Sequence, residues 1–198
     1  MPRSLDRDER LDLVARASWR VLTRDGLAAL SVRNVAAEAG LAPSSLRYVL
    51  PTQSSLKQHA VDSSLRELQR RLAAIDREAP GWAREVLVQL VPLDDERRLE
   101  MEVFLALGIA ALTDDMLRPA RERYDEVLRS ACRSAVEALA GGAARAADPA
   151  LVDTWTAVTH ALVDGLALQI VHRGPGDDAA WGERVLDAHL EHLRDALA

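Results

Sequence analysis

The sequence has few of the residues on which secreted, membrane-spanning and catalytic proteins depend. Cys132 is the only cysteine among 198 residues, which excludes an intrachain disulfide and is typical of proteins from a reducing compartment. We expect its thiol to pack as a small buried hydrophobe. No apolar run approaches the roughly 20 residues that a helix needs to cross a bilayer. These absences predict a cytoplasmic protein without a membrane partner.

Catalytic signatures are missing as well. The sequence contains no Ser-His-Asp order, nucleophile elbow, glycine-rich phosphate loop or zinc-ligand cluster. His189 and His192 have a spacing that suits a metal ion, but two histidines on a polar terminal helix more often form a solvated face. We therefore expect no metal, no cofactor and no enzymatic activity. A small helical enzyme is the weaker alternative.

What the chain does contain is helix-forming residues with an uneven distribution of charge. Hydrophobic residues make up 48% of the chain, and Ala, Leu and Arg are its most frequent residues. The net charge is −6, yet residues 1–60 carry +3 and residues 61–198 carry −9. A locally basic head on an acidic body suits a nucleic-acid partner, because phosphates respond to local rather than global charge.

Hydrophobic periodicity predicts an all-α protein of about nine helices, with no sheet and no internal repeat. Gly26 ends the first helix, Ser31 is a favourable N-cap for the second, and Pro43 suits the first turn of the third. The expected helices span residues 7–25, 32–39, 43–49, 52–78, 82–91, 95–112, 119–140, 149–172 and 179–197.

The stretch SVRNVAAEAGLAPSSLRYVL, residues 31–50, has the pattern of a helix-turn-helix. A short helix stops at Gly40, where glycine permits a sharp turn, and a second begins at Pro43. The second helix of such a motif exposes side chains near its N-terminus to the major groove of DNA. From spacing alone, an ordinary helical hairpin fits the stretch almost as well. The exposed candidates here are Ser44, Ser45, Arg47 and Tyr48.

Residues 10–56 resemble the N-terminal DNA-binding domain of the tetracycline-repressor (TetR) family of bacterial transcription regulators. The agreement includes Gly26, Ser31, Val35-Ala36, Ala39-Gly40, Ser45-Leu46 and the Pro-Thr pair at 51–52. So many residue types at fixed spacing favour this family over a simple hairpin. The resemblance implies a three-helix DNA-binding domain at residues 1–52 and a larger helical ligand-binding and dimerisation domain at residues 53–198.

The resemblance also implies which residues meet DNA, with some departures from the family pattern. Val49-Leu50 replaces a hydrogen-bonding residue and a phenylalanine, and Gln53 replaces a frequent lysine. A structural salt bridge is an equally good explanation for Arg33. The implied DNA contacts are Arg33, Ser44, Ser45, Arg47, Tyr48 and Lys57, the last being the only lysine of the chain.

In this family the later helices enclose a ligand and pair two subunits, so two further sets of residues are implied. Core packing is the alternative for every residue of the first set. Gly165 interrupts a helix at a cost of about 1 kcal/mol, which close approach of a neighbouring helix would explain, from a second subunit or from the same chain. The ligand candidates are Trp82, Met101, Glu102, Phe104, Met116, Trp155 and His160. The dimer candidates are Leu162, Gly165, Leu166, Gln169, Leu186 and Leu190.

The sequence thus predicts a ligand-responsive transcriptional regulator of DNA. We expect a repressor that binds a palindromic double-stranded operator as a homodimer and is released by a small-molecule effector. A helical ligand-binding or interaction protein with weak or lost DNA binding is the alternative, motivated by Val49 and Gln53. The sequence does not distinguish a repressor from an activator.

Overall fold

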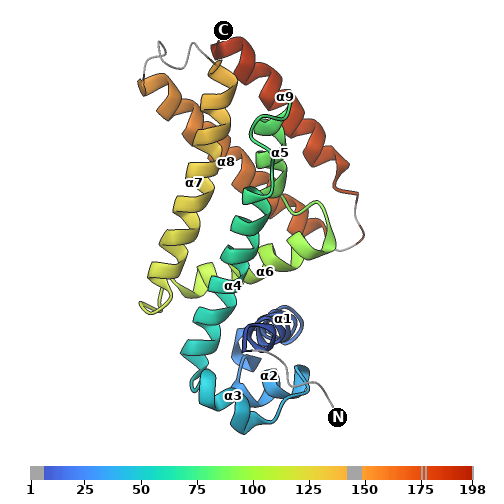
Figure 1. Ribbon diagram of the computed structural model, residues 1–198. Coiled ribbons are helices and arrows are strands. Elements are labelled where there is room, and N and C mark those ends of the chain that lie inside the picture. Colours follow the sequence, from blue (N-terminus) through green and yellow to red (C-terminus); the bar gives the residue numbers. More distant parts are fainter. Residues whose placement is uncertain (1–6, 142–148, 175, 177, 198) are drawn as a thin grey trace. The chain divides into compact units, whose positions relative to one another are not determined.

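The computed structural model describes residues 7–141, 149–174, 176 and 178–197, and within them the chain is all-α (Figure 1). This described part of the chain contains nine α-helices and one 3₁₀ turn, η1. Their bounds are α1 Arg7–Asp25, η1 Leu27–Ala29, α2 Val32–Glu38, α3 Pro43–Val49, α4 Gln53–Ala73, α5 Trp82–Gln89, α6 Asp95–Ala110, α7 Arg118–Ala140, α8 Pro149–Arg173 and α9 Ala180–Leu197.

These helices confirm the predicted fold class, and most boundaries agree within two residues. The exception is α4, which ends at Ala73 instead of residue 78. Beyond its end, the Asp76 carboxylate accepts a hydrogen bond from the Glu78 backbone N–H at 3.0 Å. A short acidic side chain that bonds to nearby backbone in this way offers the chain an alternative to the helical ladder.

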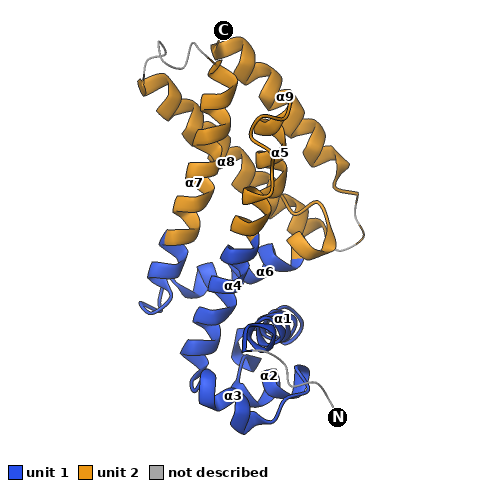
Figure 2. Cartoon of the chain, in the orientation of Figure 1, with its two compact units in different colours: residues 1–67, 99–122 blue, residues 68–98, 123–198 orange. Residues whose placement is uncertain are grey.

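The chain forms two compact units, and the first of them includes all of residues 1–52 (Figure 2). Unit 1 comprises residues 1–67 and 99–122, and unit 2 comprises residues 68–98 and 123–198. Most of α4, residues 53–67, belongs to unit 1, where it is bonded to α1. Trp19 donates its indole N–H to the Ala60 carbonyl at 3.0 Å, and the His59 Nε2 lies 2.9 Å from the Leu11 carbonyl oxygen.

The first part of unit 1 is held together by an apolar core to which α1, α2, α3 and α4 all contribute. Val14 comes from α1, Val35 from α2, Leu46 from α3 and Leu56 from α4, and each is at most 2% exposed. Burying a side chain of this size contributes about 1.5–3 kcal/mol. The core therefore fixes the orientation of the short helices α2 and α3, which are too short to be stable alone.

Unit 2 contains α5, α8, α9 and most of α7, with a core that includes Val136, Val152 and Leu193. Helices α8 and α9 approach closely, since a Cβ at Gly182 would lie 2.9 Å from the Ile170 Cδ1. Burial raises the pKa of the Cys132 thiol to about 12, which agrees with its expected role as a buried hydrophobe. None of the helices in the described ranges combines the length and apolar character of a bilayer span.

Candidate functional site

The turn between α2 and α3 is built from local hydrogen bonds that the sequence encodes. The Ser31 hydroxyl accepts a hydrogen bond from the Asn34 backbone N–H at 3.3 Å and caps α2. At the other end, Gly40 has a φ of 66° and the Leu41 N–H donates to the Ala36 carbonyl at 2.8 Å. This is the Schellman ending of a helix, in which glycine takes the left-handed conformation. The turn therefore has a defined direction.

Helix α2 is also fixed to α1 by charge. The Glu38 carboxylate accepts a hydrogen bond from Arg20 Nε at 2.7 Å and another from Arg24 Nη1 at 3.0 Å. The two guanidinium groups hold the pKa of Glu38 below its usual range. Exposed ion pairs of this kind contribute little to stability, so they orient the helix more than they stabilise the fold.

Helix α3 presents its polar side chains to solvent and its Leu46 to the core. Tyr48 is 91% exposed, whereas Leu46 is 2% exposed. Ser44, Ser45 and Arg47 are exposed as well. Hydroxyl and guanidinium groups on one exposed helix can bond phosphate oxygens, and arginine can also pair with guanine. The structure thus gathers four of the six predicted DNA contacts on one helix.

The other two predicted contacts differ from each other. Arg33 of α2 is exposed, and among the described residues no ion pair engages it or Arg47, which removes the salt-bridge explanation for Arg33 within that part of the chain. Lys57 instead donates to the Asp114 carboxylate at 3.1 Å, and its side chain is 14% exposed. Its charge is taken up inside unit 1, so Lys57 is unsuited to bind phosphate in this conformation.

The unusual residues after Tyr48 border a cavity of about 430 Å³ in unit 1. Val49 lines this cavity together with Leu11, Val14 and Arg10, so the space lies between α1 and α3. Val49 and Leu50 are half-buried. The sequence indicated the loss of a hydrogen-bonding side chain at Val49, but the cavity beside it was not predicted.

The predicted ligand residues do not form one site. Trp82 lines a cavity of about 320 Å³ in unit 2, and the Arg77 guanidinium carbon lies 5.4 Å from the centroid of its ring. Met101, Glu102 and Phe104 lie on α6 in unit 1, with Met101 only 8% exposed. Met116 is 68% exposed. A methionine open to solvent is a poor pocket wall, because a ligand pocket buries the side chains that line it.

His160 lines a different cavity of about 720 Å³ in unit 2, between α7 and α8. Thr156 and Asp164 line the same cavity from α8, one turn before and one turn after His160, and Asp125 lines it from α7. Burial raises the pKa of Asp164, and the nearby Asp125 carboxylate raises it further. The i, i+4 spacing of Thr156, His160 and Asp164 in an apolar helix was a signal in the sequence that our predictions missed.

Trp155 and the two histidines of α9 form a separate cluster in unit 2. The ring centroid of Trp155 lies 6.2 Å from that of His189 and 5.6 Å from that of His192. His189 Nε2 lies 2.9 Å from the Thr159 hydroxyl, and burial together with His192 lowers the pKa of His189. The expected solvated face is therefore wrong for His189, which is half-buried against α8.

The predicted dimer residues fall into two groups. Leu166, Leu186 and Leu190 are at most 2% exposed, because they pack inside unit 2, and so have little surface left for a partner. Gly165, Leu162 and Gln169 keep exposed or half-exposed area on α8. A Cβ at Gly165 would meet no described atom of the chain within 4 Å, so close packing inside the subunit does not explain this glycine.

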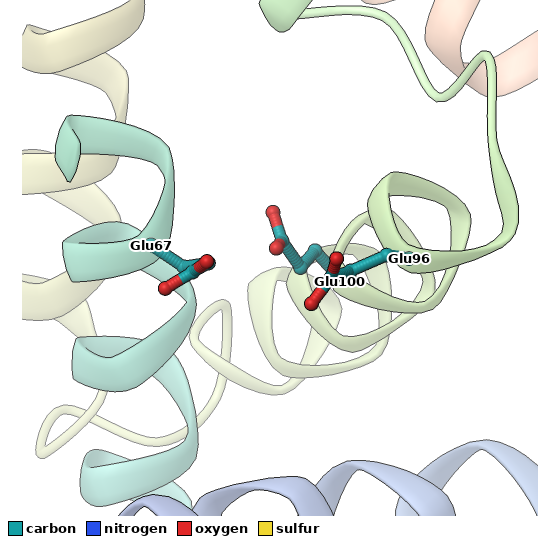
Figure 3. Close-up of side chains that lie close together, drawn as sticks. All are labelled: Glu67, Glu96 and Glu100. Carbon is teal, nitrogen blue, oxygen red and sulfur yellow. The ribbon is translucent and has the colours of Figure 1, made fainter. Parts of the chain in front are cut away.

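Two glutamate carboxylates of unit 1 lie close to each other. Glu67 of α4 and Glu100 of α6 place carboxylate oxygens within 4.8 Å of each other (Figure 3). Glu96, the third residue drawn there, belongs to unit 2. Each of the three residues makes other interactions. We assign no metal to these residues.

A capped helix, a glycine turn and a second helix with exposed hydroxyl and guanidinium groups define a helix-turn-helix DNA-binding regulator. A model of the C-terminal domain of BetI-type transcriptional repressors matches residues 79–195, more than half of the chain. The chain therefore belongs to the TetR family of transcriptional regulators. The members of this family are transcriptional regulators, not enzymes.

Individual relatives agree with this assignment. The helix-turn-helix transcriptional regulator PksA of Bacillus subtilis (strain 168) is 33% identical over 109 residues, which are 54% of this chain and 53% of PksA. The chain thus spans about half the length of that relative. A transcriptional regulator from Rhodococcus sp. Rha1 has a TM-score of 0.76 at 25% identity over 92% of this chain and 95% of its own. The multidrug binding protein EbrR, in complex with ethidium, has a TM-score of 0.58 at 27% identity over 91% and 98%.

Proposed function

We propose that the protein is a cytoplasmic repressor that binds a palindromic operator as a homodimer and is released by a small-molecule effector. The observation that carries the proposal is α3, on which Arg47 and Tyr48 are exposed to solvent. Arg33 on α2 adds a second exposed guanidinium beside the turn. Two such heads, related by two-fold symmetry, suit two half-sites about one helical turn apart.

The homodimer rests on an apolar stripe along α8. Leu151 and Val158 are 38% and 44% exposed and lie seven residues apart, with Gly165 seven residues further on. Seven residues are nearly two helical turns, so these positions share one face. An exposed apolar stripe beside a small residue is the surface that a second helix covers, and an identical subunit is the usual partner in soluble homo-oligomers.

Release by an effector requires that the ligand bind one conformation of the dimer more tightly than another. A difference of about 2–3 kcal/mol between the two conformations changes operator affinity by roughly 30- to 150-fold. The similar multidrug binding protein EbrR was solved in complex with ethidium, which supports the proposal that this chain also binds a small molecule. Two cavities of unit 2, of about 320 and 720 Å³, offer room for such a ligand.

Binding of the purified protein to DNA from upstream of its own gene, measured by fluorescence anisotropy over a series of salt concentrations, tests the proposal. We expect specific binding that weakens steeply with salt, because phosphate contacts release counterions. Arg47→Ala should cost about 1–3 kcal/mol, or roughly 5- to 150-fold in affinity. Arg121→Ala removes the same charge from an exposed position on α7 of unit 1 and should change affinity much less.

The alternative function, a ligand-binding protein that has lost DNA binding, makes the opposite prediction. It is favoured by Val49, which offers no hydrogen bond where the family pattern has one. Absence of specific binding to any native operator fragment at low salt would establish this alternative. If binding is present but Arg47→Ala leaves it within threefold of the parent, α3 is not the reading helix.

A further inference from the structure

The cavity between α7 and α8 has the size of a ligand site and lies entirely within unit 2. Its volume of about 720 Å³ falls in the range of roughly 300–1,000 Å³ that small-molecule pockets occupy. Helix α7 contributes Asp125 and Arg129, and α8 contributes Thr156, His160 and Asp164. The face of α8 that lines this cavity is opposite to the stripe that carries Leu151 and Val158.

Two polar atoms at this cavity are buried without a hydrogen bond. The Thr156 hydroxyl oxygen and the His160 Nε2 have no hydrogen-bond partner within the described part of the chain. Thr156 is only 6% exposed. A threonine in a helix can satisfy itself by bonding back to the carbonyl four residues earlier, as Thr154 does with Ala150 at 2.8 Å. Thr156 does not, although an unsatisfied buried polar group costs about 1–3 kcal/mol.

Two carboxylates lie close to the His160 Nε2 atom. His160 Nε2 lies 3.7 Å from an Asp164 carboxylate oxygen and 3.9 Å from Asp125 Oδ1. Arg129 occupies the other oxygen of Asp125, Oδ2, at 2.5 Å, so Oδ1 stays directed at the imidazole. Among the residues that line the cavity, carboxylates outnumber guanidinium groups by four to two: Asp125, Glu126, Asp153 and Asp164 against Arg129 and Arg133.

The unused groups can all accept a hydrogen bond. Carboxylates accept only, a threonine hydroxyl can accept, and a neutral imidazole with its proton on Nδ1 offers Nε2 as an acceptor. A ligand that supplies several N–H donors and a positive charge would satisfy Asp164, His160 and Thr156 together. Charge-assisted hydrogen bonds of this kind are about twice as strong as neutral ones.

The lining also separates two classes of cation. Quaternary ammonium groups have no N–H and are held by the faces of Trp, Tyr or Phe rings, none of which lines this cavity. We infer that the cavity between α7 and α8 binds a protonated primary amine, with the ammonium group between Asp164, Asp125 and His160 and one N–H directed at Thr156. The role of this amine as the effector rests on the proposed regulatory function, whereas its binding to the cavity does not.

Calorimetric titration of the full chain with 1,4-diaminobutane tests the site, with choline at equal ionic strength as the quaternary comparison. We expect diaminobutane to bind at least tenfold more tightly than choline. Asp164→Asn should weaken diaminobutane binding at least tenfold, whereas Asp195→Asn, which removes a carboxylate from an exposed position on α9, should not change it. Thr156→Val removes only the hydroxyl at nearly constant shape, and it carries the test if Asp164→Asn does not fold.

Three results overturn the inference: no binding of diaminobutane, equal binding of choline, or equal binding by the Asp164→Asn and Thr156→Val variants. Operator binding is measured separately on the same samples. If the protein binds its operator but not the amine, the amine site is refuted and the proposed regulatory function stands. If it binds the amine but not the operator, the regulatory function is refuted and the amine site stands. If the amine is the effector, diaminobutane lowers the operator affinity of the parent protein but not that of Asp164→Asn, which also controls for direct competition of the amine with DNA.

Discussion

Replacing Gly165 by alanine tests whether this position contacts a second subunit or is an ordinary helix position. Gly165 lies in the middle of α8, sixteen residues after Pro149 and eight before Arg173, and a Cβ there would meet no described atom of its own chain within 4 Å. In an isolated subunit, nothing in those contacts opposes the substitution. A partner helix seated against Gly165 would oppose it, because two-fold symmetry brings the same position from both subunits to one interface.

The two explanations predict stability changes of opposite sign for Gly165→Ala. Without a partner, alanine restores helix propensity and raises the free energy of unfolding by about 1 kcal/mol, which corresponds to roughly 2–4 °C in melting temperature for a chain of this size. With a partner packed against the glycine, an added methyl group overpacks the contact and costs about 1–3 kcal/mol. That cost weakens the dimer by roughly 5- to 150-fold.

Sedimentation equilibrium over a range of concentrations measures the dimer dissociation constant, and Gly108→Ala is the matched control. Gly108 lies near the end of α6, and a Cβ there also meets no described atom within 4 Å, so its variant should gain stability without a change in dimerisation. We expect Gly165→Ala to raise the dissociation constant at least fivefold. If it stabilises the chain as Gly108→Ala does and leaves the dissociation constant unchanged, Gly165 does not face a second subunit.

Two further predictions concern titratable groups in the cores of the units. Burial lowers the pKa of His59, so the folded state favours the neutral imidazole. The stability that the neutral imidazole contributes is therefore present above a pH of about 6.5, and it is lost as the pH falls from there through the pKa of the folded state. Chemical denaturation between pH 5 and 8 should therefore show a loss of unfolding free energy on acidification that His59→Gln reduces and His172→Gln, at an exposed position on α8, does not. Burial also raises the pKa of Cys132 to about 12, so a thiol-reactive disulfide at pH 8 should modify it at the rate of unfolding; rapid modification of the native protein would contradict its buried position.

Much of the fold could be predicted because its helix ends are encoded locally. Ser31, Gly40 and Pro43 each act through the backbone of their own neighbours, by capping, by a positive φ or by a fixed φ. Such effects depend on residue type and spacing, which a single sequence displays. The end of α4 was missed because the side-chain bond from Asp76 competes with apolar periodicity that continues past it.

Contacts between distant residues could not be predicted in the same way. Lys57 resembles a DNA-binding residue by its position, but its partner Asp114 is 57 residues away in the sequence. His160 was a ligand candidate on its own, whereas the carboxylate of Asp125 reaches it from α7 only in the folded chain. The exposed residues of α3 were predictable because alternation of core and solvent positions within one short helix fixes them.

The pairing of Lys57 with Asp114 has a consequence for chemical labelling. Arginine carries nearly all the positive charge of this chain, and its one lysine has a side chain that is 14% exposed and bonded to a carboxylate. Reagents that acylate lysine side chains therefore meet very little reactive surface on the native protein. A lysine introduced on α3 would therefore be labelled by an amine-reactive fluorophore with little competition from other side chains. The fluorophore would then lie on the helix that is proposed to enter the DNA groove.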